Sequence, residues 1–383
     1  MIMSVVCCHS AHAQDVSVRE ELEECVSSLD ITPAPADSAV VADSVAWSKK
    51  NWVSQLIENG FRVKQPGINY PKFPRFCLKV YEWGDRTFNT YDKSYVQGTG
   101  KNWKLLGKSA NWANSYFMIF PHNTQLHMLS DLNADVGGYL CFMAVSVGYM
   151  FNVNEFLSHT KSKRRNFSFN FTCALFSGNI SKSSNTGGVT IKRFGDYMDG
   201  KTISVPLENV SNNQFSFDLY YFFNHSKYSQ AAAYSYSKYQ LKSAGTWLAG
   251  VAFNNQSIGL DFESLPQEMM EFLPSLSKQY NFHYTDYNVL GGYAHNWIPR
   301  PRRWLINLTV LPSIGYKHSF EDATDGRRDM FSTNLRLMTS VVYNHRSLFA
   351  SLIGRLDAYL YYTKNFTFLN STEAFSINVG MRF

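Results

Sequence analysis

Apolar and polar positions alternate strictly along the C-terminal stretch of the chain. Between 375 and 383 every odd-numbered residue is apolar, and every even-numbered residue is small or polar. A two-residue period predicts a β-strand whose two faces meet different surroundings. An apolar face opposite a small, polar face is typical of a strand in a transmembrane β-barrel, with lipid outside and a polar lumen inside.

The same pattern recurs along most of the preceding chain, in segments separated by turn residues. We predict strands at 75–83, 114–120, 125–133, 138–151, 165–178, 187–195, 214–224, 229–240, 245–258, 281–297, 304–320, 331–344, 347–363 and 372–383. Barrels of one bacterial chain have an even number of strands. We therefore expect an all-β, antiparallel transmembrane barrel of about 12 strands, within a range of about 10–14.

The lengths of the connections predict which way the barrel stands in its membrane. Barrels of this class have short periplasmic turns and longer extracellular loops. Three connections are short, namely Leu241–Ala244, Ile298–Arg303 and Asn344–Ser347. Three alternating ones are longer, namely 259–280, 321–330 and 364–371. The last strand then runs towards the periplasm.

Aromatic residues sort into two belts in this orientation. Trp304 and Tyr316 are twelve residues apart on one predicted strand, which separates the belts by roughly 25–30 Å for a tilted strand. That distance is close to the thickness of a membrane and disfavours a soluble barrel of the lipocalin type. The periplasmic belt is Trp247, Trp297, Trp304, Tyr343 and Phe383, and the outer belt is Tyr316, Phe331, Tyr362 and Phe375.

The closing strand also has the form of a C-terminal assembly signal. An alternating strand that stops on an aromatic residue is similar to the ending by which outer-membrane proteins are recognised. We predict that the barrel assembly machinery binds it through Phe375, Ile377, Val379, Met381 and Phe383.

Composition agrees with a barrel and argues against two other classes. Hydrophobic residues make up 45% of the chain and charged residues 17%, yet the mean hydropathy is only −0.25. No apolar run of about 18 residues is present, so the sequence predicts no membrane-spanning helix. The net charge of +6 comes largely from turns such as Lys161–Arg165 and Arg300–Arg303. We therefore predict no nucleic-acid partner, and outer-membrane lipids as the surroundings.

The N-terminal part divides into two predicted segments before a barrel at 71–383. Residues 1–13 have the form of a signal peptide, with an apolar stretch before the small-x-small site Ala11–Ala13. Its true start is expected to lie upstream. Residues 14–70 form a predicted periplasmic extension with an amphipathic helix over Ser44–Asn59, ended by Gly60. This helix either rests on the barrel rim or enters the barrel as a plug.

The cysteines do not indicate a metal site. Those remaining after residue 14 show no Cys-x-x-Cys or Cys/His spacing. Alternation places Cys141 and Cys173 on the lipid-facing side, where a thiol behaves as a small apolar group. We predict no cofactor and no bound metal.

Charged residues on the inward face form the candidate functional site. They are Asp218, Asp286, Lys317, Arg336, Arg355 and Asp357. A turn at 345–346 would set Arg336 opposite Arg355. On another pair of strands, Tyr284 would fall opposite Lys317. Two facing guanidinium groups repel each other. The cluster therefore either fills a narrow lumen with salt bridges or binds an anionic solute, and the inward Tyr359 and Tyr361 favour a filled lumen.

One short motif calls for a comparison with outer-membrane acyl hydrolases. Such enzymes use a His-x-Ser pair with a polar residue about a dozen positions later. His345-Arg346-Ser347 has the spacing of the pair, but the residue about a dozen positions after Ser347 is Tyr359. The pair also falls in a predicted periplasmic turn. We interpret it as a polar hairpin turn and predict no catalytic residues.

Four stretches carry a resemblance to a known family. They are Arg75–Tyr81, Phe88–Val96, Tyr221–Ser229 and Gln240–Trp247. They resemble an uncharacterised (domain-of-unknown-function) outer-membrane β-barrel family of Gram-negative, gut-associated bacteria, over roughly residues 50–383. The resemblance implies a barrel in the outer membrane and brings no activity. Three functions stay open: a narrow or plugged barrel for a small solute, a structural or interaction barrel, and a lipid hydrolase.

Overall fold

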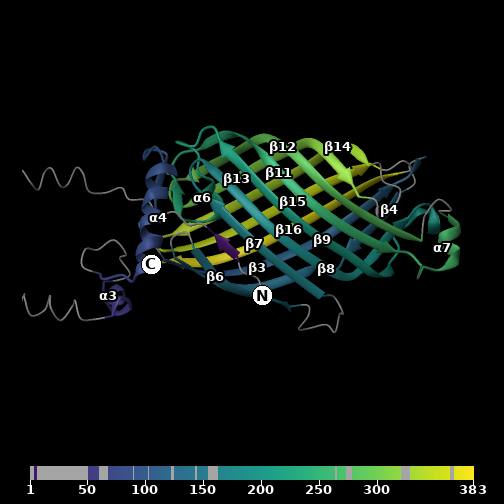
Figure 1. Ribbon diagram of the computed structural model, residues 1–383, viewed down its shortest axis with the longest axis horizontal. Helices are drawn as coiled ribbons and strands as arrows, with labels where there is room; N and C mark the ends of the chain where they lie inside the picture. The colour runs from purple at the N-terminus through teal and green to yellow at the C-terminus, as the bar shows by residue number, and fades with distance from the viewer. Residues whose placement is uncertain are drawn as a thin grey trace, which may run out of the picture.

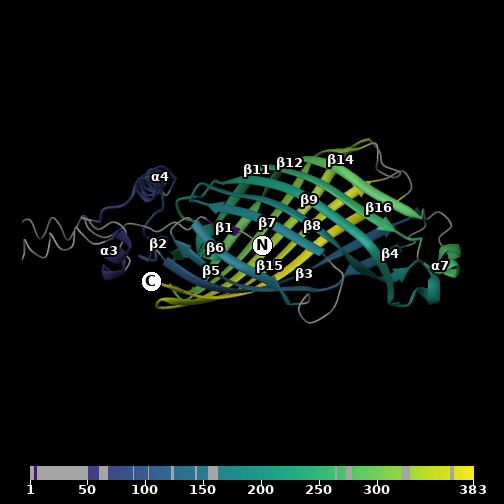
Figure 2. The same ribbon diagram turned by 60° about the horizontal axis from the view of Figure 1, so that its bottom comes forward.

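The computed structural model describes a closed barrel preceded by two helices (Figures 1 and 2). The described residues are 4–6, 51–59, 68–88, 90–101, 103–121, 125–142, 145–153, 163–263, 265–272, 278–320, 328–362 and 366–383. The signal peptide apart from residues 4–6, and the extension as far as residue 50, lie outside this set. None of the helices in the described ranges combines the length and hydrophobicity needed to cross a membrane.

A ring of ten antiparallel strands forms the wall of the barrel. It closes because β4 pairs on one side with β3 and on the other with β8, while β16 pairs along its length with β3. The ten strands are β3 (Trp103–Ile119), β4 (Gln125–Ser130), β8 (Phe176–Phe194), β9 (Val205–Phe222), β11 (Ala244–Asp261), β12 (Gln279–Arg300), β13 (Trp304–Ser319), β14 (Asp329–His345), β15 (Leu348–Tyr362) and β16 (Thr367–Arg382).

Shorter strands widen the wall at the end where the chain terminates, which we name the C-terminal end. There β5 (Asn133–Phe142) pairs with the first half of β3, and β6 (Val145–Asn152) pairs with β5. On the other side, β7 (Lys163–Thr172) pairs with the first half of β8. The three-residue β1 (Ser4–Val6) pairs in parallel with β7. The predicted antiparallel transmembrane barrel of 10–14 strands is thereby confirmed.

Four predicted strands are wrong, for identifiable reasons; one of them, 165–178, runs from β7 through a turn at 173–175 into β8. Segment 75–83 lies in helix α4 (Lys72–Phe88), because its apolar residues recur every three to four positions. Pro71 and Pro74 stand at the helix start, where proline is tolerated. Segment 229–240 contains helix α6 (Gln230–Tyr234), which Ser229 caps before an alanine run. Segment 138–151 is a hairpin of β5 and β6, and Phe142 pairs with Val145.

The hairpin and a neighbouring turn also correct the placement of both cysteines. Tyr139 and Cys141 are buried against Met150, whereas Tyr149 and Phe151 are exposed, because the chain reverses between Phe142 and Val145 and the two strands of the hairpin therefore differ in which positions face outward. Cys173 is buried in the turn between β7 and β8, where its thiol donates to the carbonyl of Phe176 at 3.4 Å. Neither thiol lies on the lipid face.

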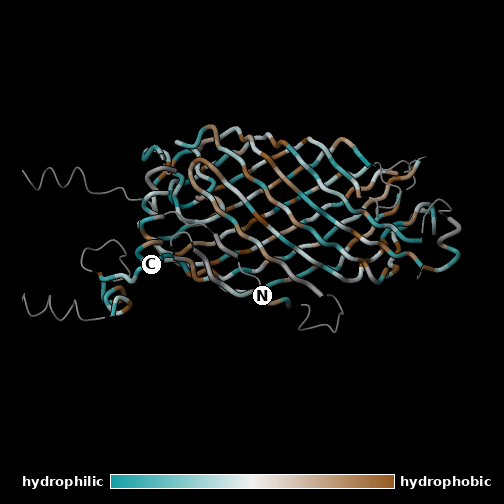
Figure 3. The backbone as a smooth tube through the Cα atoms, in the orientation of Figure 1, coloured by the Kyte–Doolittle hydropathy of each residue, from teal (hydrophilic) through white to brown (hydrophobic). Residues whose placement is uncertain are grey.

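Hydrophobic and hydrophilic residues alternate along the strands of the wall (Figure 3), and many of the exposed residues are large and apolar, as is expected of a barrel in lipid. Trp247, Phe331 and Val379 are the most exposed members of the predicted outward sets, at 67%, 60% and 59%. Tyr343, Tyr362 and Phe383 are half-buried. The other outward members are also exposed, namely Trp297, Trp304, Tyr316, Phe375, Ile377 and Met381.

A charge on this face should destabilise the barrel according to its depth. We expect Ile377→Arg to lower the free energy of unfolding by about 2–4 kcal/mol, because arginine near the bilayer centre loses its hydration. Glu373→Arg is the matched control, since Glu373 is exposed on the same face of β16 nearer the strand's start. We expect it to cost about 0–1 kcal/mol. Equal costs in urea titrations in lipid vesicles would contradict a lipid-facing wall.

Candidate functional site

The interior of the barrel is filled in three layers, and an aromatic cluster closes the end opposite the C-terminus. Phe282 and Phe368 stack with ring centroids 4.0 Å apart, and Tyr361 packs edge-on against Phe282. The connection between β11 and β12, with helix α7 (Gln267–Phe272), adds Phe262 and Met269 to this cluster. We name this layer the aromatic cap. It is closely packed and apolar.

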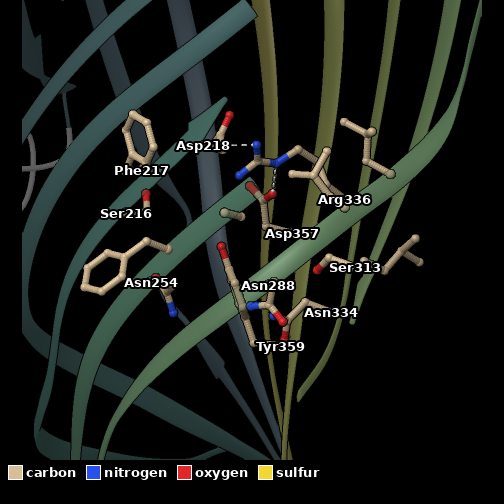
Figure 4. Close-up of a pocket in the computed structure, with 15 residues that line it drawn as sticks. Ser216, Phe217, Asp218, Asn254, Asn288, Ser313, Asn334, Arg336, Asp357 and Tyr359 are labelled. Atoms are coloured by element: carbon tan, nitrogen blue, oxygen red, sulfur yellow. Dashed lines mark hydrogen bonds and ion pairs between the residues drawn. The ribbon is translucent and has the colours of Figure 1, made fainter. Parts of the chain in front are cut away.

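Ion pairs occupy the middle of the lumen and connect three strands (Figure 4). The guanidinium of Arg336 contacts Asp218 at 2.7 Å and donates from Nε to Asp357 at 2.6 Å. Arg355 donates from Nε to the second oxygen of Asp357 at 2.5 Å. Two positive and two negative groups therefore balance one another within this network.

A second ion pair lies closer to the aromatic cap. Lys317 and Asp286 are fully buried, with 3.3 Å between their nitrogen and oxygen. The ammonium also donates to the carbonyl of Leu360 at 2.6 Å and lies 4.1 Å from the ring centroid of Tyr284. Ser332 donates to the carboxylate at 3.1 Å. The ion pair, the hydrogen bonds and the ring together offset the cost of burying two charges.

The pairing between strands differs from the predicted register. Arg336 lies directly opposite Asp357, not Arg355, and Lys317 lies opposite Asp286, not Tyr284. The first difference arises because the β14–β15 turn occupies residues 346–347, with Arg346 at a positive φ of 53°. Moving a two-residue turn by one position shifts the register by two. The predicted repulsion between guanidinium groups therefore does not occur.

A small polar cavity lies beside the Arg336 network. Its volume is about 40 Å³, and its lining includes Asn254, Asn288 and Asn334. Within the described chain, Asn254 Nδ2, Asn288 Oδ1 and Asn334 Oδ1 are buried without a hydrogen-bond partner. One water molecule needs about 10–15 Å³ of such space, so this polar cavity has room for a few water molecules. It is too small for an organic solute.

The third layer, at the C-terminal end, is a folded segment that we name the plug, residues 223–243. Its helix α6 lies at the C-terminal end of the barrel (Figure 1), and the adjoining Tyr236 is buried among side chains of the wall. Ala232, Ala233 and Tyr236 pack against Leu305, Val342 and Phe349 of the wall. Outside the lumen, its strand β10 (Lys238–Gln240) pairs with β2 (Val96–Gly98). The plug is thereby fixed to both the wall and the segment before the barrel.

Two basic residues of the wall hold the plug by its backbone. Lys104 of β3 donates to the carbonyl of Ser235, and Arg382 of β16 donates from Nε to the carbonyl of Tyr236 at 2.7 Å. These carbonyls directly follow α6, where a helix leaves acceptors unsatisfied. Arg382 also donates to Asn344 at 2.7 Å and lies 4.5 Å from the ring of Phe349. We name Lys104 and Arg382 the latch.

Tyrosine hydroxyls of the plug add side-chain contacts with the wall. Tyr236 and Ser351 are 2.5 Å apart at their hydroxyl oxygens, and Tyr234 donates to Asn307 at 2.7 Å. Burial raises the pKa of Tyr236, so its hydroxyl remains protonated. At the other boundary, Asn224 donates to the carbonyl of Gly245 at 2.8 Å. The plug is thus bound by polar contacts along much of its length.

The structure brings together the charged residues named from the sequence and adds others. Arg336, Arg355, Asp357 and Asp218 form one network, and Lys317 with Asp286 forms a separate pair. The latch was not predicted from the sequence. Arg382 was assigned to the polar face of the last strand, but no partner could be named while 229–240 was predicted to be wall. The amphipathic helix of residues 44–59, described as α3 (Trp52–Glu58), contacts Trp103 at the rim and does not supply the plug.

The described ranges show no candidate metal site. They contain no group of three His, Cys, Asp or Glu side chains arranged to hold a metal ion. His345 pairs with Leu348 at the end of the β14–β15 hairpin, and Ser347 lies in its exposed turn. The arrangement is that of a hairpin turn.

The Lys317–Asp286 pair provides a test of the filled lumen. We expect Lys317→Met to lower the free energy of unfolding by about 3–5 kcal/mol, because it leaves a buried carboxylate without its cation. The double variant Lys317→Met/Asp286→Asn should recover much of this loss, since no charge remains. Urea titrations in vesicles measure both. A single variant as stable as the wild type would show that water reaches the pair.

Two bacterial proteins of solved structure align with this chain at low identity and low TM-score. The outer membrane protease OmpT from Escherichia coli aligns at 9% identity and a TM-score of 0.33, covering 74% of this chain and 97% of that one. The translocator domain of autotransporter NalP from Neisseria meningitidis aligns at 7% identity and a TM-score of 0.30, covering 81% and 94%. These similarities concern the fold and transfer no activity.

Sequence comparison identifies the family. No curated protein matches the chain significantly. The family model described as "Domain of unknown function (DUF4421)" matches residues 90–383, which include the whole barrel, the plug and β2. The protein therefore belongs to the DUF4421 family of β-barrel proteins.

Proposed function

We propose that this protein is an outer-membrane barrel that is closed at rest and admits a small polar solute when its plug moves. The observation that carries the proposal is the latch. Lys104 and Arg382 hold the plug by hydrogen bonds to two backbone carbonyls. Each such bond contributes about 1.5–3 kcal/mol when the donor is charged, and water can replace it. A segment held in this way can leave the lumen without unfolding the wall.

The middle layer supports passage or binding of a polar solute. It places two arginines and two aspartates on strands β9, β14 and β15. A buried ion-pair network is often no more stabilising than apolar residues of similar volume. Its presence is therefore better explained by contact with water and solute than by stability alone. The width of the open passage would depend on how far the plug is displaced.

The exposure of Arg355 favours an anionic solute. Arg336 is neutralised by two carboxylates, whereas the side chain of Arg355 contacts one and is 35% exposed. Lys108 of β3 lies within electrostatic range of Arg355. Arg355 and Lys108 are thus the cations that a solute would meet in the middle layer.

The proposed orientation places the C-terminal end towards the periplasm. In support, the turns at 301–303 and 346–347 are short, and the connections at the opposite end, such as 262–278 and 320–328, are longer. The exception is the plug, residues 223–243, which stands at the C-terminal end where the sequence predicts a short turn over Leu241–Ala244. The plug would then be opened from the periplasmic side. The helices α3 and α4 and the rest of the N-terminal extension would lie in the periplasm.

Removing the latch should open the barrel. We expect the wild type to show little conductance in planar bilayers, and Lys104→Gln/Arg382→Gln to show more openings, because the plug loses its charged donors and only the aromatic cap then closes the lumen. Arg303→Gln is the matched control, since Arg303 is an exposed residue of a turn at the same end. In the open variant, Arg355→Gln should reduce the preference for anions over cations.

A second candidate, a structural or interaction barrel, is favoured by a different observation. The aromatic cap fills the other end of the lumen with buried apolar side chains. A barrel that never opens would show no conductance, either as the wild type or as the variant without the latch. If deletion of residues 227–240, in a protein that still folds by heat-shifted gel mobility, also yields no conductance, the solute proposal fails and the structural one replaces it.

A further inference from the structure

Helix α4 carries aromatic side chains that face away from the barrel protein. Phe73, Phe76 and Trp83 are exposed at 74%, 63% and 62%. Their spacings of three and seven residues place them on one side of the helix. Three large aromatic residues on one exposed face form a continuous apolar stripe, which in water is unfavourable.

A basic stripe adjoins the aromatic one. Lys72, Arg75 and Lys79 are exposed and lie three and four residues apart, which places them on one side of the helix beside the aromatic stripe. Arg75 donates to Asn69 at 3.2 Å and to the carbonyl of Tyr70 at 2.9 Å, which fixes the helix start. The two lysines extend beside the aromatic stripe. Aromatic residues on one face with lysines along its edge are typical of helices that lie in a membrane interface.

Packing holds α4 at the C-terminal end of the wall. Leu78 of α4 and Trp103, the first residue of β3, both pack against Leu56 of α3. Trp103 in turn stacks on Phe383, with ring centroids 6.4 Å apart. In Figures 1 and 2, α4 lies just beyond this end and runs across the long axis of the barrel. A helix across the barrel axis is parallel to the plane of a membrane around the barrel.

We propose that α4 binds the phospholipid leaflet that surrounds the C-terminal end of the barrel. Phe73, Phe76 and Trp83 enter the boundary between headgroups and acyl chains, and Lys72 and Lys79 contact lipid phosphates. Such helices bury their apolar face by about 5–10 Å. This inference rests on the proposed membrane orientation only in naming the leaflet as the periplasmic one.

Two observations favour lipid over a protein partner. The lipid-facing surface of the wall continues to the same end, where Leu105 and Met381 are exposed at 50% and 40%. The cationic edge complements anionic phospholipid, and each lysine near such a surface contributes about 1 kcal/mol. The aromatic stripe therefore extends an apolar surface that already meets lipid.

Quenching by brominated lipid tests the contact directly. The full chain is reconstituted in vesicles of phosphatidylethanolamine and phosphatidylglycerol with bromine near the top of the acyl chains. Because the chain has 8 tryptophans, the signal of Trp83 is the difference between the wild type and Trp83→Phe. We expect brominated lipid to remove most of this difference. Bromine near the chain ends should remove less.

Matched variants separate lipid contact from other causes. Lys72→Gln/Lys79→Gln should reduce the quenching in phosphatidylglycerol and leave it unchanged in phosphatidylcholine, whereas Glu82→Gln on the opposite face should change neither. A Trp83 signal that brominated lipid does not alter, in protein with normal heat-shifted mobility, overturns the proposal and leaves the stripe to a protein partner. The readout does not depend on conductance, so it is independent of the proposed function.

Discussion

The side chain of Arg382 connects the closing strand of the barrel to the plug, and the arrangement of the C-terminal end depends on it. A guanidinium that points inward from the last strand must find acceptors, because burying it without partners is costly. Its partners are the carbonyl of Tyr236 and the side chain of Asn344, with Phe349 beneath the group. The plug thus satisfies a charge that the wall presents. The wall also donates hydrogen bonds to the two carbonyls that directly follow the short helix α6.

The same constraint explains the middle of the lumen. A wall in lipid must direct its apolar residues outward, so its polar residues are directed into a narrow interior. Charged groups confined there pair with one another, as Arg336 does with Asp218 and Asp357 and as Lys317 does with Asp286. What they leave open is a cavity of about 40 Å³ between asparagine side chains. The resting barrel is therefore closed by its own polar residues and two end layers, and motion of the plug is the simplest way to connect this interior with one side.

The wall could be predicted from the sequence because its pattern is local. Alternation depends only on the next residue but one, and it identified the outward face of β16 and the inward orientation of Arg336 and Asp357. The plug could not be predicted in this way, because Tyr234, Ser235, Tyr236 and Ser237 alternate as a strand would. A helix there is favoured by the Ser229 cap and by wall side chains that are distant in sequence. The pairing of Arg336 was missed because it depends on Arg346, and not its neighbour, taking positive φ.

Backbone hydrogen exchange of the plug tests the closed, latched barrel most directly. The amides of Tyr228 and Ser235 donate within the segment to Asn224 and Ala231. In the reconstituted protein, these amides should exchange as slowly as those of the strands around them, because the latch keeps the plug inside the lumen. In Arg382→Gln they should exchange much faster, while the strand amides remain protected. Fast exchange at Tyr228 and Ser235 in the wild type, equal to that of exposed loops, would contradict a plug held in the barrel.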